Sequence, residues 1–346
     1  MIDRPTVVVT GASAGVGRAT AVAFAQRGWN VALIARGQES LDGAQRDVAA
    51  AGGLALVLPL DVADADAVFA AADRVAAEWG HIDVWVNNAM VTIFAPVKDI
   101  KPEEFRRVTE VTYLGQVHGT MAALKHMKWL NKGTIVQVGS ALSYRAIPLQ
   151  SAYCGAKFAV RGFTDALRSE LEHEHSSIRL TMVQLPAVNT PQFDWARSRL
   201  SHKLQPVPPI YQPEAIAGEI VRAAIEAPRE LWIGKSTLKA IFGNMLLPRL
   251  GDRILAREGY DGQVTAELAP PDRRDNLFEP VPSDPGIHGR FDRAASRHVM
   301  AFDPVRLRAG IACAIIASIG GLLAVATSRR SQTRARGRRR GVSIFG

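Results

Sequence analysis

Short apolar runs alternate with helical patterns through the first two thirds of the chain, and this alternation constrains the fold more than any other feature. The runs are apolar on both faces, which is typical of parallel strands covered by helices on both sides. We expect strands at 6–12, 30–36, 54–62, 82–89, 133–141, 178–187 and 230–234. Helical patterns occupy 15–28, 40–53, 64–80, about 103–128 and about 151–175. The sequence therefore predicts a three-layer α/β fold with helices on both faces of a parallel sheet.

The alternation stops after residue 235, and the remaining chain has a different character. Residues 236–260 form an amphipathic helical pattern, whereas 264–305 are rich in Pro, Asp, Gly and Arg and are typical of a loop or linker. We therefore expect four parts, which are a nucleotide-binding catalytic domain at 1–235, an amphipathic segment and linker at 236–305, an apolar helix at 306–328 and a basic tail at 329–346.

The stretch TGASAGVG at 10–17 lies between the first strand and the first helix. Glycines at such a junction let the backbone approach a pyrophosphate, and the helix N-terminus supplies amide donors and a positive dipole end. A tight turn without a ligand has a similar pattern, but the strand-to-helix position favours a nucleotide site. The candidate cofactor contacts here are Gly11, Ser13, Gly15, Val16 and Gly17.

The end of the second strand indicates which dinucleotide would bind. A site for NAD places an acidic residue there to bind the ribose 2′-hydroxyl, but this chain has Ala35 followed by Arg36. An arginine suits the 2′-phosphate of NADP through a bidentate contact, although it could also be a solvated residue at the strand end. Asp61, after the third strand, could accept from the adenine amino group, cap the next helix, or do both.

Three polar residues follow the fifth strand and predict a catalytic group. Ser140 ends that strand, and Tyr153 precedes Lys157 by four residues, which places both on one face of a helix. The carboxyl ends of parallel strands form the ligand crevice, so these side chains could converge beside the cofactor. Tyr153 could then exchange a proton with a carbonyl oxygen that Ser140 also contacts. Lys157, together with the positive nicotinamide of the oxidised cofactor, would lower the pKa of the phenol.

With these motifs in order, residues 4–235 resemble the short-chain dehydrogenase/reductase family. The resemblance rests on TGASAGVG, Asp61, NNA at 87–89, Ser140 thirteen residues before Tyr153, YCGAK at 153–157 and PAVNT at 186–190. It implies a Rossmann fold with a seven-stranded sheet, NAD(P) binding, and dimers or tetramers built on two long helices. It also adds cofactor contacts from Val62, Asn88, Ala89, Tyr153, Lys157, Pro186, Val188 and Thr190.

Three positions depart from the family pattern. Met90 and Ala187 each replace a usual glycine, and Met90 could narrow the space near the adenosine. Thr112 stands where the family usually has a catalytic asparagine, whose backbone carbonyl holds a water that links the lysine to solvent. Because that contact is made by the backbone, we keep Thr112 as a catalytic candidate on condition that a local helix kink is present.

Other side chains carry weaker signals. His173 and His175 lack the further ligands that a metal site requires, so we expect no metal. The segment 188–212 corresponds to the family's substrate lid and contains Phe193 and Trp195, together with Leu200 and Tyr211. These residues either line a hydrophobic substrate site or simply pack the lid onto the body.

The C-terminal part has an uncharged apolar stretch and a basic tail. Residues 309–327 contain no charge, and as a helix they would span about 28 Å, near the thickness of the bilayer hydrocarbon. We expect either membrane insertion or an apolar packing helix. Seven arginines follow at 329–346, and without them the net charge falls from +9 to +2. They could bind anionic lipid headgroups, while no recognition motif supports nucleic acid binding.

The positive-inside rule would place the basic tail in the cytoplasm and the catalytic domain on the other side. Because NADPH and the lack of a signal-peptide pattern argue against that, we expect membrane association with the catalytic domain in the cytoplasm, or a cytoplasmic protein if the segment is not inserted. The overall hypothesis is an NADP(H)-dependent oxidoreductase that interconverts a hydrophobic ketone and a secondary alcohol, with Tyr153 as general acid and base. The alternative is a dinucleotide-binding regulator or scaffold with slow or no turnover.

Overall fold

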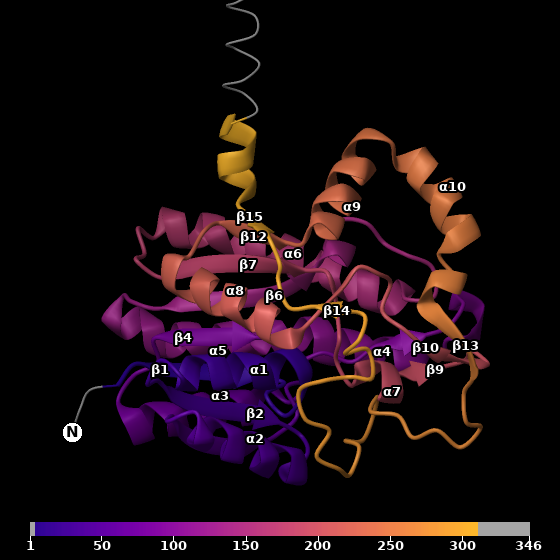
Figure 1. Cartoon of the computed structure of the whole chain (residues 1–346). Helices are drawn as coiled ribbons and strands as arrows, with labels where there is room; N and C mark the ends of the chain where they lie inside the picture. Colours follow the sequence, from indigo (N-terminus) through magenta and orange to yellow (C-terminus); the bar gives the residue numbers. More distant parts are fainter. Residues whose placement is uncertain (1–3, 311–346) are drawn as a thin grey trace, which may run out of the picture. The chain divides into compact units, whose positions relative to one another are not determined.

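A sheet of eight strands forms the centre of the computed structural model, which describes residues 4–310 (Figure 1). Its strand order is β15–β12–β7–β6–β4–β1–β2–β3, and all pairs are parallel except β12 with β15. The parallel strands are β1 (Thr6–Thr10), β2 (Asn30–Ala35), β3 (Leu54–Pro59), β4 (Val84–Asn87), β6 (Thr134–Ser140), β7 (Arg179–Leu185) and β12 (Glu230–Ile233). Each coincides with an apolar run, so the mostly parallel α/β sheet is confirmed. The sheet has eight strands instead of the expected seven, because β15 (Ala301–Phe302) adds a strand at its edge.

Helices cover both faces of this sheet. One face packs against α1 (Gly15–Ala25), α2 (Gln38–Ala50) and α8 (Pro213–Glu226), and the other against α3 (Ala65–Trp79), α5 (Gly115–Leu130) and α6 (Ser151–His173). Alternate side chains of each strand enter opposite cores, as Val7 and Val9 do on one face and Val8 on the other. The sheet is therefore buried on both sides, which explains why its strands read as continuous apolar runs.

The long helical pattern expected at about 103–128 is interrupted in the structure. It consists of α4 (Pro102–Thr109), a π-helical turn at Glu110–Leu114, and α5. A π turn widens the helix locally and is common at functional sites. The turn contains Thr112, so the regular α-helix is interrupted at this position.

The strand order reverses direction between β1 and β4. From β1 the chain proceeds through β2 to β3, whereas from β4 it proceeds through β6 to β7 on the other side. In open parallel sheets the ligand crevice lies outside the carboxyl ends of the strands at such a switch point. The segments after β1 and β4, which contain TGASAGVG and NNA, therefore meet there.

The chain after residue 235 differs from the linker expected from its composition. It begins with α9 (Lys235–Leu246) and α10 (Pro248–Glu258) and continues through β13 (Val264–Leu268), β14 (Ala295–Ser296) and β15. Strand β13 pairs with β10 (His202–Leu204), and β14 pairs with β11 (Ile210–Tyr211). The chain up to Phe302 thus forms one compact unit, with residues from Asp303 in a second. Local Pro and Gly content predicted irregular backbone but could not reveal these long-range contacts.

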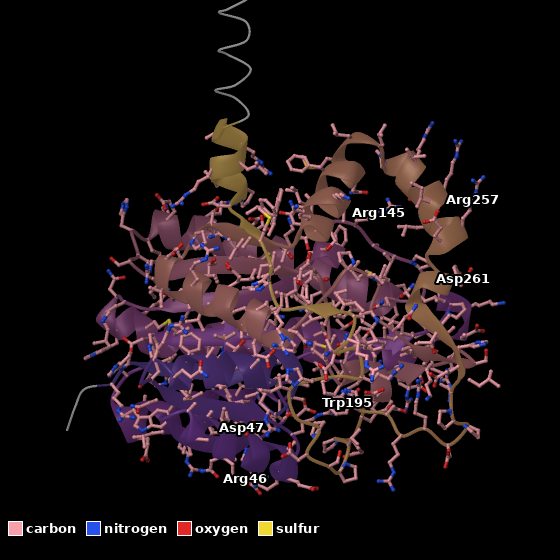
Figure 2. The ribbon with its side chains drawn as sticks, in the orientation of Figure 1. Arg46, Asp47, Arg145, Trp195, Arg257 and Asp261 are labelled. Carbon is pink, nitrogen blue, oxygen red and sulfur yellow. The ribbon has the colours of Figure 1, made fainter. Side chains whose placement is uncertain are left out.

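The two helices α9 and α10 at the start of this extension form a hairpin. Pro248 is the first residue of α10, a position that proline favours. Arg145 fastens the hairpin to the body, because its guanidinium lies 3.0 Å from Oδ1 of Asn244 on α9 and 2.7 Å from Oδ1 of Asp252 on α10 (Figure 2). The amide of Asn244 also donates to the carbonyl of Tyr144. The hairpin is therefore held by the loop that follows β6.

Short elements complete the described chain. They are β5 (Ile93–Phe94), β8 (Ala187–Val188), α7 (Gln192–Trp195), β9 (Arg197–Ser198) and 3₁₀ turns at Val97–Asp99, Ala141–Ser143 and Asp261–Gln263. Among residues 4–310, no helix combines the length and the apolar character needed to span a bilayer. The apolar stretch at 309–327 and the basic tail lie almost wholly outside the described residues.

Candidate active site

A cavity of about 680 Å³ opens at the carboxyl ends of the strands. Its volume falls within the range of small-molecule and cofactor sites, which is roughly 300–1,000 Å³. The candidates from the sequence that line it are Gly11, Ser13, Gly15, Val16, Gly17, Arg36, Asp61, Val62, Asn88, Ala89, Ser140, Tyr153, Lys157, Pro186, Val188 and Thr190. Thr112 is the one candidate that does not reach the cavity wall.

The glycine loop after β1 leaves no room for side chains. Gly11 has φ +67°, and a Cβ there would lie 2.8 Å from Cα of Ala89. Gly15 has φ +53°, and a Cβ would lie 2.9 Å from Cγ2 of Thr190. At Gly17 a Cβ would overlap the carbonyl of Gly11. This close backbone packing at the start of α1 fits the diphosphate of a dinucleotide, which binds through amides and the helix N-terminus.

Asn88 ties the two strands at the switch point together. Its side-chain nitrogen lies 3.0 Å from the carbonyl oxygen of Thr10, and its backbone N–H donates to the hydroxyl of Thr10 over 2.9 Å. The backbone N–H of Ala89 donates to the same hydroxyl. The NNA segment thus fixes the position of the glycine loop rather than merely lining the cavity.

Ser140 is held by contacts on its backbone as well as its side chain. Its N–H donates to Oε1 of Gln184 over 2.8 Å, and its hydroxyl oxygen accepts from the backbone of Leu142. Gln184 in turn donates to Glu230, whose carboxylate also accepts from the hydroxyl of Tyr144. The sequence analysis missed Gln184 and Glu230, because only the neighbouring positions of β6, β7 and β12 bring them behind Ser140.

Tyr153 and Lys157 lie in the first turns of α6, below the end of β6. The Lys157 side chain is buried, with 1 % of its surface exposed, and its Nζ donates to the carbonyl of Val138 over 2.7 Å. The same Nζ is 5.6 Å from the centre of the Tyr153 ring. The helical spacing therefore brings the ammonium and the phenol together as expected, with β6 fixing the lysine.

Burial dominates the ionisation of both groups. It raises the pKa of Tyr153 above its ordinary value, and the hydrogen bond with Ser140 opposes part of this rise. It lowers the pKa of Lys157 to about 7. In the protein alone, the low-dielectric surroundings therefore disfavour both charged forms, whereas the expected lowering of the phenol's pKa includes the positive charge of the oxidised nicotinamide.

The Thr112 side chain forms hydrogen bonds with the segment after β4 and does not face the cavity. Its hydroxyl donates to the carbonyl of Val91 over 2.8 Å and accepts from the N–H of Val91 over 3.1 Å. The side chain is fully buried. Thr112 thus anchors the segment after β4, which contains Met90 and Val91 on the cavity wall.

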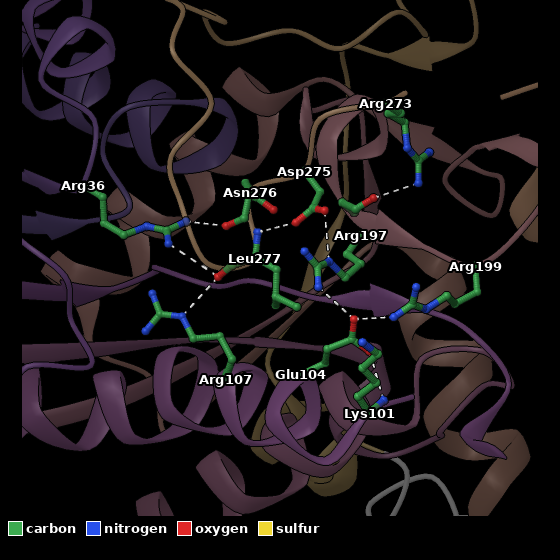
Figure 3. A network of polar contacts seen from close by, with 11 residues as sticks. Arg36, Lys101, Glu104, Arg107, Arg197, Arg199, Arg273, Asp275, Asn276 and Leu277 are labelled. Carbon is green, nitrogen blue, oxygen red and sulfur yellow. Dashed lines mark hydrogen bonds and ion pairs between the residues drawn. The ribbon is translucent and has the colours of Figure 1, made fainter. Parts of the chain in front are cut away.

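Arg36 and Asp61 line the nucleotide end of the cavity, but both have protein partners. Arg36 donates to backbone carbonyls of residues 276–278 in the C-terminal extension, among them those of Asn276 and Leu277 (Figure 3). Asp61 forms an ion pair with Arg107. The other carboxylate oxygen of Asp61 accepts from the N–H of Ala63 and so caps the turn before α3, whose own N-cap is Asp64. Both residues line the cavity, and their partners could not be predicted from the sequence because they come from distant segments.

The extension supplies a wall of the cavity that the sequence analysis did not foresee. Ser236, Thr237 and Ala240 of α9 line it, as do Ile254 and Leu255 of α10. Residues Asn276, Pro280, Val281 and Pro285 line it from the segment expected to be a linker. One signal was available, since Leu277 is an apolar residue within a polar stretch and is completely buried.

Of the four apolar or aromatic residues of the segment 188–212, two line the cavity and two do not. Phe193 and Trp195 line the cavity, whereas Leu200 and Tyr211 do not. Phe193 also packs against Phe94 and Phe291, with ring centres 6.3 Å and 6.0 Å away. Among residues 4–310, no group of three or more His, Cys, Asp or Glu side chains is arranged to hold a metal ion.

Known proteins share this sequence and this fold. The sequence model of the short chain dehydrogenase family matches residues 5–200. The uncharacterized oxidoreductase YxnA of Bacillus subtilis is 31% identical over 94% of this chain and 90% of its own length. An uncharacterized oxidoreductase of Mycobacterium bovis is 30% identical over 82% of this chain and 84% of its own. Coverage by YxnA extends into the C-terminal extension.

Solved structures agree with the sequence comparison. An alcohol dehydrogenase from Thermococcus sibiricus, complexed with 5-hydroxy-NADP, matches with a TM-score of 0.57 and 28% identity over 66% of this chain and 95% of its own. A metagenomic short-chain oxidoreductase in complex with NADP matches with a TM-score of 0.53 and 28% identity over 64% and 90%. With its Rossmann-like sheet and the family match over more than half its length, this chain belongs to the short-chain dehydrogenase family of oxidoreductases.

Proposed function

We propose that this protein is an NADP(H)-dependent oxidoreductase that interconverts a ketone and a secondary alcohol, with Tyr153 as the general acid and base. The observation that carries the proposal is the shared cavity, in which Ser140, Tyr153 and Lys157 face the same space as the glycine loop. A proton-transfer group beside a dinucleotide site is what carbonyl reduction requires.

The residues divide the work of the reaction. The bound nicotinamide would supply or accept the hydride. In reduction, Tyr153 donates its proton to the carbonyl oxygen as negative charge develops there, and in oxidation its phenolate form takes the proton from the alcohol. The Ser140 hydroxyl contacts the same oxygen, while Lys157 holds a proton close to the phenol. Burial raises the pKa of Tyr153, so the phenol is protonated at neutral pH in the protein without cofactor, which is the state that reduction requires.

The cofactor would be held by the glycine loop, Asn88, and the segment from Pro186 to Thr190. Preference for NADP(H) is supported by Arg36 at the end of β2, since guanidinium groups suit phosphate and no acid stands at Ala35. The two NADP complexes among the similar structures agree with this preference. Replacing Arg36 by Ala should weaken NADPH binding and leave NADH binding nearly unchanged, measured by cofactor fluorescence.

A hydrophobic substrate is supported by the walls near Tyr153. Leu142, Ile147, Phe193, Trp195 and Ile254 contribute apolar surface to the cavity. Apolar walls with a few convergent polar groups are typical of sites for hydrophobic small molecules. A panel of ketones with increasing alkyl length, assayed by NADPH oxidation, should show kcat/KM rising with apolar size. NADPH binding without oxidation of any ketone, unchanged by Tyr153→Phe, would instead favour the regulator or scaffold.

Membrane association is a further part of the proposal. It is supported by the uncharged stretch at 309–327 with the arginines behind it, and by exposed apolar residues at the α9–α10 corner, where Leu246 is 74 % and Leu247 59 % exposed. Basic residues Arg249 and Arg253 flank this corner and suit anionic headgroups. A chain ending at residue 305 should lose membrane association in fractionation, with the catalytic domain remaining in the cytoplasm.

A homodimer or homotetramer is supported by the exposed apolar side chains on the two long helices. Leu114 precedes α5, Met121 lies on it, and Phe158 lies on α6, with exposures of 37 %, 50 % and 42 %. Such side chains on one molecule are suitable for burial between copies. Light scattering of the purified protein should give a mass of two or four chains, and Met121→Glu together with Phe158→Glu should reduce it to one.

A further inference from the structure

A segment of the C-terminal extension lies against the nucleotide end of the cavity. We name residues 275–286 the clasp. Four of its residues, Asn276, Pro280, Val281 and Pro285, line the same cavity as Arg36 and Asp61. The clasp therefore forms part of the wall where the adenosine half of a dinucleotide would bind.

Contacts at both ends fasten the clasp to the body. Leu277 is completely buried in the core that contains α3 and α5. At the other end, Asp284 pairs with the buried guanidinium of Arg18 on α1. The carbonyl of Gly286 accepts from the N–H of Gly15 in the glycine loop, over 3.2 Å. The clasp is thus an ordered part of the site rather than a passing loop.

Successive carbonyl groups of the clasp converge on two arginines. Arg36 donates to the carbonyl of Phe278 over 2.7 Å and to that of Asn276 over 2.5 Å. Arg107 donates through Nε to the carbonyl of Leu277 over 3.1 Å (Figure 3). Three adjacent acceptors therefore face guanidinium donors, which is the arrangement that the oxygens of a phosphate would also offer.

These carbonyls and a ribose 2′-phosphate would compete for the same donors. A guanidinium binds a phosphate through charge-assisted, bidentate contacts, which are roughly twice as strong as hydrogen bonds between neutral groups. A phosphate could therefore replace neutral carbonyls on Arg36. A 2′-hydroxyl has no such charge and would leave the carbonyls in place.

We propose that the clasp is a cofactor-selectivity element, in which the carbonyls of residues 276–278 occupy the Arg36 donors that a 2′-phosphate needs. Binding of NADP(H) then requires displacement of this part of the clasp, whereas NAD(H) binds beside it. The clasp reduces the preference for NADP(H) that Arg36 alone would give. This inference rests on the proposed dinucleotide function and concerns only the choice between the two cofactors.

Binding measurements on the full-length protein test the inference. Leu277→Ala should loosen the clasp, because it removes the apolar anchor, and should raise the ratio of NADPH affinity to NADH affinity by about fivefold or more, corresponding to about 1 kcal/mol. The gain should vanish in the double variant with Arg36→Ala. Leu268→Ala is the matched control, since Leu268 lies in the same extension with 70 % of its surface exposed.

The possible results separate this inference from the function on which it rests. A ratio that stays the same in Leu277→Ala, or that changes equally without Arg36, overturns the inference and leaves the oxidoreductase proposal intact. Failure of the unaltered protein to bind either dinucleotide overturns both.

Hydrogen exchange in the unaltered protein decides the matter if Leu277→Ala does not fold. The N–H of Asn276 donates to the carbonyl of Trp195, and that of Leu277 donates to Asp275. Saturating NADPH should speed exchange at these two amides relative to saturating NADH. Equal protection with both cofactors would overturn the inference.

Discussion

Nζ of Lys157 lies 2.7 Å from the carbonyl oxygen of Val138, two residues before Ser140 on the same strand. This bond joins α6 to β6 at the point where both deliver catalytic candidates. The lysine therefore positions the helix that carries Tyr153 as well as placing a basic group near the phenol. Its two roles can be separated by measuring activity and stability independently.

Removal of the phenolic hydroxyl should abolish most activity without preventing cofactor binding. In Tyr153→Phe, no group remains to donate a proton to the developing alkoxide, so kcat should fall by about 10³-fold, within the range for lost general acid–base catalysis. NADPH titration by fluorescence should give a dissociation constant within about threefold of the unaltered protein. A variant that retains most of its turnover would rule out Tyr153 as the proton donor.

Replacement of Lys157 should change how stability depends on pH. The folded protein releases the Lys157 proton near pH 7, whereas the unfolded chain keeps it to about pH 10.4. Between these values the unfolded state binds more protons, so this lysine makes the free energy of unfolding rise with pH. Relative to Lys157→Met, the unaltered protein should gain about 2 kcal/mol between about pH 7 and about pH 9.

Urea denaturation of both proteins at the two pH values measures that difference. Lys239→Met is the control, because Lys239 lies on the exposed part of α9. Parallel pH profiles for the unaltered protein and Lys157→Met would show that the lysine stays charged when folded.

The main sheet and its ligand crevice could be predicted because their signals are local. Seven apolar runs each became a strand, and the spacing from Ser140 to Tyr153 to Lys157 placed all three in one cavity. The clasp could not be predicted in this way. Its ordered conformation depends on the burial of Leu277 in the core. It also depends on hydrogen bonds from Arg36 and Arg18 to acceptors more than two hundred residues away, and hydrophobic periodicity does not predict such contacts.

The ionisation states of the site also could not be predicted from the sequence. A tyrosine and a lysine at helical spacing suggest mutual stabilisation of charge, yet the actual balance depends on how completely each is buried. Lys157 is buried to 1 % exposure, and this burial lowers its pKa.

The tight packing of the glycine loop predicts a strong effect of a single methyl group. In Gly17→Ala, the new Cβ would overlap the carbonyl of Gly11 and lie 2.5 Å from Nδ2 of Asn88. Displacement of both groups should widen the loop, weaken NADPH binding by at least about tenfold and lower the melting temperature. Gly162→Ala provides the control, because Gly162 is an exposed position of α6 where a Cβ meets nothing within 4 Å, and the alanine should stabilise the helix by about 0.5–1 kcal/mol.

Thr112 is the remaining test of how this chain departs from the family pattern. Both of its hydroxyl contacts go to the backbone of Val91, at 2.8 Å and 3.1 Å. Thr112→Val keeps the shape but leaves the N–H and carbonyl of Val91 without these partners in a buried setting, which should lower the free energy of unfolding by about 1–3 kcal/mol. Thr112→Ser keeps the hydroxyl and should lose much less. Urea denaturation with NADPH binding as a second readout checks both variants, and equal stabilities of Val and Ser would show that the hydroxyl does not hold the Met90–Val91 wall.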